Sequence, residues 1–389
     1  GKTIVALTAA FNVIKSGFQV AVMAPTEILA RQHFTLAKKI FEKNNKIEIL
    51  SSKSQYSEKK IITKKLINNE IDIIFGTHAI FQKKILFKKL GLIIIDEQHK
   101  FGVNQRKKLS DKGGNNCDVL LMSATPIPRT LTMTIYGDMD LSIIKEKPKL
   151  RKEVITYSKL ESKIDEVLRY ITKEVDNDNQ VFWVCPLIEE SKKLDHTSAV
   201  KKYEFLSKKF PNQVALLHGK TDPEDKQIIL NKFLKNKFKI LVSTTIIEVG
   251  IDFPNANVIV IENANKFGLS QLHQLRGRVG RGEKQSTCIL MFKSSLTENA
   301  KKRLNILKNS TDGFNISEED MRLRGFGDIL GFKQSGIKIF KLADPIHNSD
   351  LFDLAEKEIK IMESKNISIS KYKTLMKLYD QADVINDIV

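Results

Sequence analysis

Short apolar runs alternate along this chain with amphipathic stretches, and this alternation limits the fold more than any other feature. Runs rich in Val, Ile and Leu predict strands in the first half at Gln19–Ala24, Ile71–Phe75, Leu92–Ile95 and Val119–Met122. The second half repeats the pattern at Val154–Tyr157, Val181–Cys185, Val214–Leu217, Lys239–Ser243, Val258–Ile261 and Thr287–Phe292. Strands that alternate with helices form parallel sheets with helices on both faces. The sequence therefore predicts two successive α/β domains.

A charged stretch that contains a proline, Lys145–Lys152, separates the two sets of strands. We interpret it as a linker and predict domains over residues 1–147 and 152–310, followed by a C-terminal helical segment over residues 311–389. Between the strands we expect helices, for example from Glu27 to about Lys43 and over Pro223–Leu234. A length of 389 residues suits two domains of about 150 residues each with an appended segment.

The chain carries 64 Lys and Arg residues against 46 Asp and Glu residues, which gives a formal net charge of +18. Such an excess favours a polyanionic partner, most simply nucleic acid. A lysine-rich surface that only interacts with water would have the same composition, so charge alone leaves both interpretations open. No apolar run approaches the ~18 residues of a membrane span, and no membrane partner is expected.

The cysteines indicate the redox environment. Cys117, Cys185 and Cys288 lie far apart and are odd in number. This set argues against a disulfide framework or a Cys-based zinc site and favours a reducing, cytoplasmic compartment. The sequence contains no sign of assembly, so we expect a monomer.

The first residues, Gly1-Lys2-Thr3, match the last three positions of the phosphate-binding pattern G-x-x-x-x-G-K-[ST]. A helix is predicted directly behind them, as the pattern requires. In a complete loop, Lys2 would neutralise the β- and γ-phosphates and Thr3 would bind Mg²⁺. Three residues alone are a weak signal. Because the first five positions of the pattern are not in the sequence, we expect this chain to be a piece of a longer protein.

Polar clusters follow the predicted strands of the first half, and Asp96-Glu97 after Leu92–Ile95 is the sharpest of them. One carboxylate can hold Mg²⁺ through water, and its neighbour can orient and deprotonate an attacking water. Ligands in such folds lie at the carboxyl ends of strands. Two exposed acids at a strand end would be the structural alternative. The other clusters are Pro25-Thr26-Glu27, Gly76-Thr77-His78 and Ser123-Ala124-Thr125.

The second half has no phosphate loop of its own but contains the segment Gln274–Arg281, with three arginines in six residues and two glycines. Packing does not readily explain so many guanidinium groups. They suit a loop and helix that bring arginines to a phosphate, where an arginine finger contributes roughly 10³–10⁵ in rate. A basic surface that binds nucleic acid is the alternative.

Taken in order, these motifs resemble the core of superfamily 2 helicases, in which two RecA-like lobes close on ATP. The resemblance implies ATP-driven movement on nucleic acid, with Thr3 and Asp96 on Mg²⁺ and Glu97 activating water. It adds nucleotide contacts from Gly1, Lys2, His99, Gly250 and Asp252, brings Arg278 and Arg281 to the γ-phosphate, and makes Gln274 catalytic. The residues it assigns to the nucleic acid backbone and to coupling are Thr26, Thr77, His78, Thr125, Thr244 and Thr245.

Further segments are similar to the RecG family of branch-migration helicases, namely Ile95–Val103, Pro126–Leu131 and Asp312–Gly336. The last resembles a translocation motif, in which a helical hairpin and a following loop move duplex DNA. Arg322, Arg324 and Gln334 match that motif. The family resemblance implies branched double-stranded DNA as partner, with Holliday-junction migration and fork regression as activities.

The chain departs from the family pattern in lacking most of the phosphate loop and any counterpart of the OB-like wedge domain. Lys100 stands where the family usually has Arg. Three alternatives remain open. These are a transcription-repair coupling translocase of the Mfd type, an RNA helicase of the same superfamily, and a DNA-binding fragment that does not hydrolyse ATP.

Overall fold

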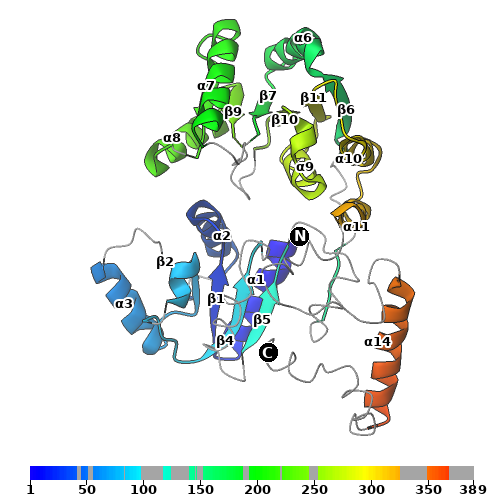
Figure 1. The fold of residues 1–389 in the computed structure, drawn as a ribbon. Helices are drawn as coiled ribbons and strands as arrows, with labels where there is room; N and C mark the ends of the chain where they lie inside the picture. The colour runs from blue at the N-terminus through cyan, green and yellow to red at the C-terminus, as the bar shows by residue number, and fades with distance from the viewer. Residues whose placement is uncertain are drawn as a thin grey trace. The chain divides into compact units, whose positions relative to one another are not determined.

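The computed structural model describes residues 1–41, 45–50, 56–82, 84–97, 117–123, 140–144, 146, 152–186, 192–219, 221–244, 253–324 and 348–367. The chain divides into two compact units. The first contains residues 1–124 and 143–145, and the second contains most of the rest. Figure 1 shows the helices and strands of each unit. No helix in the described part of the chain is long and apolar enough to cross a membrane.

The first unit is built on a five-stranded parallel sheet with the order β2-β3-β1-β4-β5. Its strands are β1 (Gln19–Met23), β2 (Ile47–Leu50), β3 (Ile73–Gly76), β4 (Leu90–Ile95) and β5 (Asp118–Leu121). Its helices are α1 (Lys2–Lys15), α2 (Glu27–Ile40), α3 (Tyr56–Ile67) and the 3₁₀ turn η1 (His78–Phe81). The central strand β1 is buried along its whole length.

Burial on both faces explains why the central strands are continuous apolar runs. Val20 and Val22 of β1 pack on one face with residues of α1 and α2. Ala21 and Met23 pack on the other face with residues of α3 and η1. Successive side chains of a strand point to opposite faces, so a sheet covered on both sides needs apolar residues at every position. The helices thus fix the sheet, and the carboxyl ends of its strands carry the polar clusters.

The second unit has a six-stranded parallel sheet with the order β6-β11-β10-β7-β9-β8. Its strands are β6 (Ile155–Leu160), β7 (Gln180–Val184), β8 (Val214–Leu217), β9 (Ile240–Ser243), β10 (Ala256–Ile261) and β11 (Thr287–Phe292). Its α-helices are α6 (Ile164–Asp176), α7 (Lys192–Lys209), α8 (Pro223–Leu234), α9 (Leu269–Arg276), α10 (Glu298–Asn309), α11 (Gly313–Arg324) and α14 (Ser349–Ser364). The 3₁₀ turns η4 (Glu161–Lys163) and η5 (Ala264–Lys266) complete it.

Two layers of side chains hold this second sheet. On one face, residues of α6 and α7 surround Val181 and Trp183. On the other face, Phe182, Phe233 and Phe253 form a ring cluster with centroids 5.4 Å apart.

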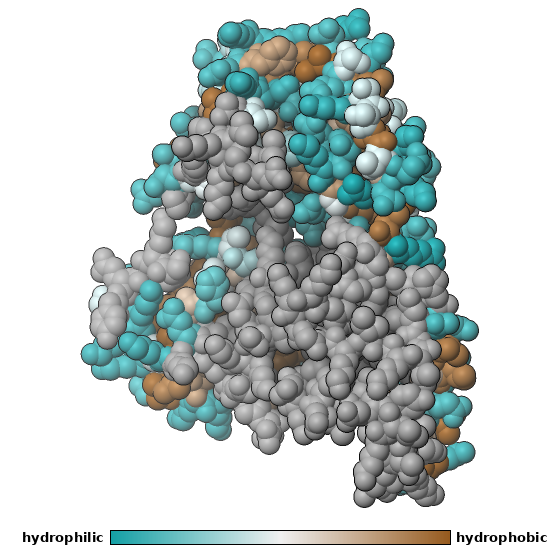
Figure 2. Space-filling model, in the orientation of Figure 1, coloured by the Kyte–Doolittle hydropathy of each residue, from teal (hydrophilic) through white to brown (hydrophobic). Residues whose placement is uncertain are grey.

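Further along the chain, α14 carries both hydrophobic and hydrophilic residues on the surface seen in Figure 2.

In both sheets the central strand begins with a glutamine whose side chain makes the same kind of hydrogen bonds. Gln19 begins β1, and its side-chain amide donates to main-chain carbonyls at the end of α3 and just before β3. Gln180 begins β7 and donates in the same way to carbonyls in α8 and just before β9. The turns that these two glutamines hold in place contain Asn69 and Asn236, both with positive φ. Asn tolerates the left-handed conformation better than most residues. The two units are therefore related in detail, which confirms the predicted pair of RecA-like parallel-sheet lobes.

Candidate functional site

The phosphate-binding end of the first unit begins at Gly1, which is the N-cap of α1. The carbonyl of Gly1 accepts from the main-chain N–H groups of Ile4 and Val5, and no side chain caps the helix. The first turn contains no acidic residue. First-turn N–H groups of a helix have no intrahelical partner and suit an anion. This helix start is therefore able to receive phosphate.

The ammonium group of Lys2 lies among the acidic residues of the same sheet edge. Its Nζ donates to the main-chain carbonyl of Ser123, which follows β5. Burial lowers the pKa of Lys2, and the negative charges of Glu97 and then Asp96 partly oppose this by raising it. The sequence motifs that carry Lys2, Ser123 and the two acids are thus gathered at one place within the first unit.

Asp96 and Glu97 come directly after β4 and are both buried. Asp96 uses both carboxylate oxygens: Oδ1 accepts from the main-chain N–H of Glu97 at 3.0 Å, and Oδ2 lies 2.8 Å from Nε2 of His33. The backbone of Glu97 is in the left-handed region, with φ of 53°. This conformation costs a non-glycine residue about 1–3 kcal/mol and is concentrated at functional sites. The pair is not the exposed pair of acids that was the structural alternative.

These residues fit a magnesium nucleotide. Carboxylates and hydroxyls are the donors that Mg²⁺ prefers, and it is usually held by one or two carboxylates together with substrate phosphates. Asp96 has lone pairs beyond its two hydrogen bonds, and Thr3 lies in the first turn of α1. Within the described residues no group of three or more His, Cys, Asp or Glu side chains could cage a metal ion by itself. Phosphate oxygens and water are the ligands that usually complete such a donor set.

The threonines predicted to contact nucleic acid differ in their surroundings. The hydroxyl of Thr26 caps α2 by accepting from the N–H of Leu29 at 3.3 Å. Thr77 is buried and precedes η1, whereas His78 is exposed. Thr244 follows β9, is 2% exposed, and its Oγ1 has no hydrogen-bond partner in the described part of the chain. A buried hydroxyl without a partner costs free energy, which is typical of a group whose partner is a ligand.

The arginine segment of the second unit lies on α9 and the turn that follows it. Gln274 is half-buried, Arg278 is buried and Arg281 is exposed. Arg276 corrects the sequence interpretation, because its guanidinium is buried and donates to the carbonyls of Leu307 at 2.6 Å and of Ser310 at 2.8 Å. Burial lowers the pKa of Arg276. The guanidinium binds carbonyls at the C-terminal end of α10. A structural role in packing therefore explains why one of the three arginines is present.

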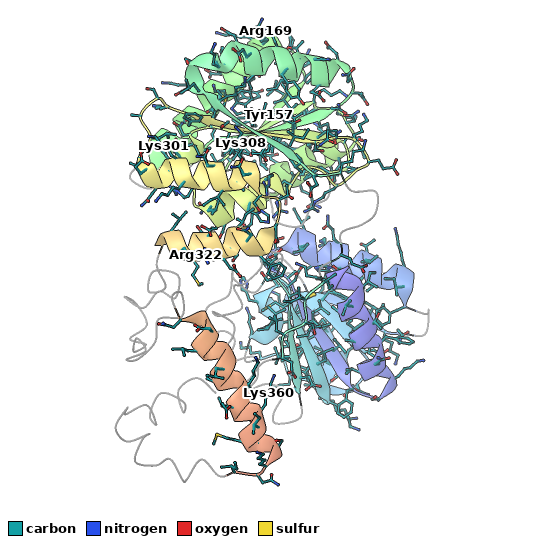
Figure 3. The ribbon with its side chains drawn as sticks, turned by 90° about the vertical axis from the view of Figure 1, so that its right-hand side faces the viewer. Tyr157, Arg169, Lys301, Lys308, Arg322 and Lys360 are labelled. Atoms are coloured by element: carbon teal, nitrogen blue, oxygen red, sulfur yellow. The ribbon has the colours of Figure 1, made fainter. Side chains whose placement is uncertain are left out.

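Helix α11, which begins the predicted translocation motif, and the preceding helix α10 both pack against α9 and the turn before it. Ser270 of α9 donates to Asp320 of α11 at 2.5 Å. Arg303 of α10 donates to the carbonyls of Phe267 and Asn265, which precede α9. Arg322 is exposed on α11 and pairs with Glu319 at 2.8 Å; Figure 3 shows it with Lys301 and Lys308 of α10.

Several predicted site residues cannot be placed. His99, Thr125, Thr245, Gly250, Asp252 and Gln334 lie outside the described residues. Arg324 ends α11, and its side chain also lies outside the description.

Sequence reasoning missed His33 and the ion pair of Lys202 with Glu262. A signal for His33 was available, since it lies four residues after Leu29 and four before Ala37 on the buried face of α2. A histidine in the middle of an apolar helix face must find a polar partner. Lys202 and Glu262 are joined only by the tertiary fold, and their local sequence gives no such signal.

Comparisons with known proteins agree with this fold. The DEAD/DEAH box helicase family model matches residues 1–134, and the model of the helicase conserved C-terminal domain matches residues 162–283. The ATP-dependent DNA helicase RecG of Bacillus subtilis is 47% identical over 361 residues, which cover 92% of this chain and 53% of that relative. RecG of Aquifex aeolicus is 46% identical over 386 residues, covering 97% of this chain and 49% of the relative.

Among solved structures, a structure of RecG bound to a three-way DNA junction has a TM-score of 0.72 and 43% identity. The alignment covers 90% of this chain and 46% of that chain. Two related parallel sheets, with the acidic pair beside a lysine in the first and the arginine segment in the second, define a superfamily 2 helicase core.

Within that class, the chain belongs to the RecG family of ATP-dependent DNA helicases. It spans about half the length of the curated relatives it matches.

Proposed function

We propose that this chain is the motor of an ATP-dependent translocase that moves on double-stranded DNA and unwinds branched DNA. The observation that carries the proposal is the buried Asp96–Glu97 pair, with Glu97 in a left-handed backbone and Lys2 beside both carboxylates. Such a pair suits hydrolysis of the phosphoanhydride bond of a nucleotide that is held by a metal ion. The family relationship supplies ATP as the nucleotide and DNA as the track.

In this proposal Thr3 and Asp96 hold Mg²⁺, which neutralises charge on the β- and γ-phosphates when it is bound. Lys2 exchanges its bond with the Ser123 carbonyl for the phosphates. Glu97 orients the attacking water and accepts its proton.

Gln274, Arg278 and Arg281 of the second unit act on the γ-phosphate. Their contacts exist only while that phosphate is present, and a ligand shifts a conformational equilibrium by its differential affinity for the two states. Hydrolysis removes the contacts that these residues make with the γ-phosphate. The units would therefore bind and release each other once in each cycle. The segment around Arg322, Arg324 and Gln334 would convert that cycle into movement along duplex DNA.

We propose branched DNA as the substrate, including Holliday junctions and stalled forks, because one relative in the family is bound to a three-way junction. The net charge of +18 favours phosphate contacts. Such contacts carry little base information, and affinity falls with salt roughly in proportion to the number of phosphates neutralised. Binding should therefore weaken steeply with salt and show little sequence preference.

The test is an ATPase assay with and without a synthetic three-way junction, combined with a strand-separation assay on the same DNA. Because the relatives are longer, this chain is assayed beside the full-length RecG of Bacillus subtilis as a positive control. We expect junction DNA to raise ATP turnover and strands to separate only when ATP is present. DNA binding without hydrolysis by this chain, under conditions in which the relative hydrolyses ATP, would instead support a non-hydrolysing DNA-binding role.

A further inference from the structure

We infer that His33 is a positioning residue that joins the helix carrying Thr26 to the metal-binding carboxylate of Asp96. The inference rests on the proposed function, because it assigns Asp96 to Mg²⁺ and Thr26 to DNA. Through His33, a movement of α2 on the DNA changes the orientation of the carboxylate that holds the metal. His33 itself does not touch the nucleotide.

The contact is short and buried. Nε2 of His33 lies 2.8 Å from Oδ2 of Asp96, and the two residues are 7% and 8% exposed. Because Oδ1 of Asp96 already accepts from the N–H of Glu97, the carboxylate is held on both oxygens. Two hydrogen bonds fix its rotation, and the lone pairs left over set where a metal-bound water can lie. Partners of this kind orient metal ligands, and removing them typically costs about 10–100-fold in metal affinity.

The helix provides a rigid connection to the predicted DNA contact. Thr26 caps α2 through the N–H of Leu29, and Leu29, Ala30, His33 and Ala37 form its buried face. Seven residues separate Thr26 from His33, which is about 10 Å along a helix. A packed helix moves as one body, so a displacement at its first turn also displaces the imidazole. A shift of about 1 Å would lengthen the bond to Asp96 beyond hydrogen-bond range.

The second unit contains a comparable pair, in which a lysine stands in place of the histidine. Glu262 follows β10 as Asp96 follows β4, and each donates its main-chain N–H to the last residue of the central strand at 2.9 Å. In the second unit, Lys202 of α7 lies 2.7 Å from Glu262. The full charge of an ammonium neutralises that carboxylate. Asp96 is paired with an imidazole ring instead of an ammonium group, and its remaining lone pairs stay available to a cation.

The test compares His33→Ala with His33→Gln, whose amide can donate from a position near that of Nε2. The matched control is Thr35→Ala, which changes an exposed hydroxyl on the same helix. The first measurement is the binding of Mn²⁺, used in place of Mg²⁺, by electron paramagnetic resonance with a non-hydrolysable ATP analogue present. The second is the ratio of ATP turnover with and without junction DNA. Both measurements use the 389-residue chain.

We expect His33→Ala to weaken Mn²⁺ binding by about tenfold or more and to lower the stimulation by DNA. His33→Gln should restore most of both, and Thr35→Ala should change neither. In an Asp96→Asn background, His33→Ala should add less than about twofold, because residues acting through one another are not additive. Unchanged Mn²⁺ binding in His33→Ala would overturn the inference. So would equal losses in the Ala and Gln variants accompanied by a lower melting temperature, which indicates packing alone.

The measurements also separate this inference from the proposed function. If junction DNA fails to stimulate the unaltered protein, the proposed function fails. In that case the Mn²⁺ titration would still test whether His33 positions Asp96.

Discussion

Arg276 donates to the main-chain carbonyl of Leu307 at 2.6 Å, and so the helix that leads into the arginine segment is joined to the end of α10. The same Nη1 atom reaches the carbonyl of Ser310, beyond the helix end. Carbonyls at a helix C-terminus have no intrahelical partner and carry partial negative charge. The guanidinium of Arg276 on α9 therefore provides hydrogen-bond donors to carbonyls at the C-terminus of α10. It also fixes the end of α9, from which the turn with Arg278 and Arg281 continues.

We expect Arg276→Met to destabilise the protein by roughly 2–4 kcal/mol, since it leaves buried carbonyls without the charged donor they now have. Methionine keeps much of the side-chain volume, so the loss measures the hydrogen bonds more than a cavity. Chemical denaturation followed by circular dichroism would report it. Lys301→Met is the control, because Lys301 is exposed on α10 and its ion pair with the exposed Glu298 should contribute little to stability. Equal effects of the two substitutions would contradict the structural role of Arg276.

Glu97→Gln should bind ATP about as well as the unaltered protein and lose ATP turnover. The amide fills the same space and keeps the hydrogen bond from the main-chain N–H to Asp96 Oδ1, but it cannot accept a proton from water. Nucleotide binding is measured with a fluorescent ATP analogue, and turnover by phosphate release. Turnover within about twofold of the unaltered protein would remove Glu97 from the catalytic role.

Arg324→Ala should leave DNA-stimulated ATP hydrolysis largely intact and reduce strand separation. The family resemblance puts Arg324 in the motif that moves DNA, whereas the hydrolytic residues lie elsewhere in the chain. The two activities are compared on one preparation, with Lys308→Ala, an exposed position on α10, as control. A parallel loss of both activities would indicate a structural role for Arg324.

The strands could be predicted from sequence because burial on both faces leaves a strong local signal. β8 and β11 have the predicted bounds, as does helix α8. Strand β2 was missed: Ile47–Leu50 is only half-buried along most of its length and contains Glu48, so its signal is short and mixed. Helix α3 was also missed, since its lysines alternate with apolar residues without a clear helical stripe.

The site was predictable in its residue types but not in its contacts. A local motif does not indicate which of the guanidinium groups is buried, because the partner of Arg276 lies 31 residues further along the chain. The left-handed backbone of Glu97 and the bond from His33 to Asp96 arise from the tertiary fold. Lys2, Asp96 and Glu97 were expected near each other only because the carboxyl ends of parallel strands share an edge.

The three thiols should differ sharply in reactivity. Burial raises the pKa of Cys117 to about 11, with a further contribution from Asp118. Burial likewise raises the pKa of Cys288 to about 12 and that of Cys185 further. The thiolate is the reactive form, so at pH 8 Cys117 should react roughly 100-fold more slowly than an unperturbed thiol. Its rate should rise with pH up to about 11, whereas the two buried thiols should react only on unfolding.

Alkylation with iodoacetamide across a pH series, followed by mass spectrometry of peptides, measures these rates. The denatured protein is the control, and there all three cysteines should react alike. Rapid labelling of Cys185 at pH 8 in the native protein would contradict the burial of that thiol.

Thr244→Val should make the protein more stable and its DNA binding weaker. The hydroxyl of Thr244 is buried with no partner among the described residues, and valine has nearly the same shape without the polar atom. Removing an unsatisfied buried hydroxyl should raise the free energy of unfolding by about 1 kcal/mol. If the hydroxyl serves a DNA phosphate, the same change removes a hydrogen bond and weakens binding by about tenfold.

Ser243→Ala provides the matched comparison, because Ser243 ends β9 and its hydroxyl also has no partner within the described segments. It should gain stability in the same way but leave DNA binding unchanged, since the family resemblance assigns Thr244, and not Ser243, to the nucleic acid backbone. Denaturation midpoints and fluorescence anisotropy with labelled junction DNA give the two quantities. A Thr244→Val protein that is more stable and binds DNA normally would show that this hydroxyl has no ligand on the DNA, and the second unit's contact would then have to come from another residue.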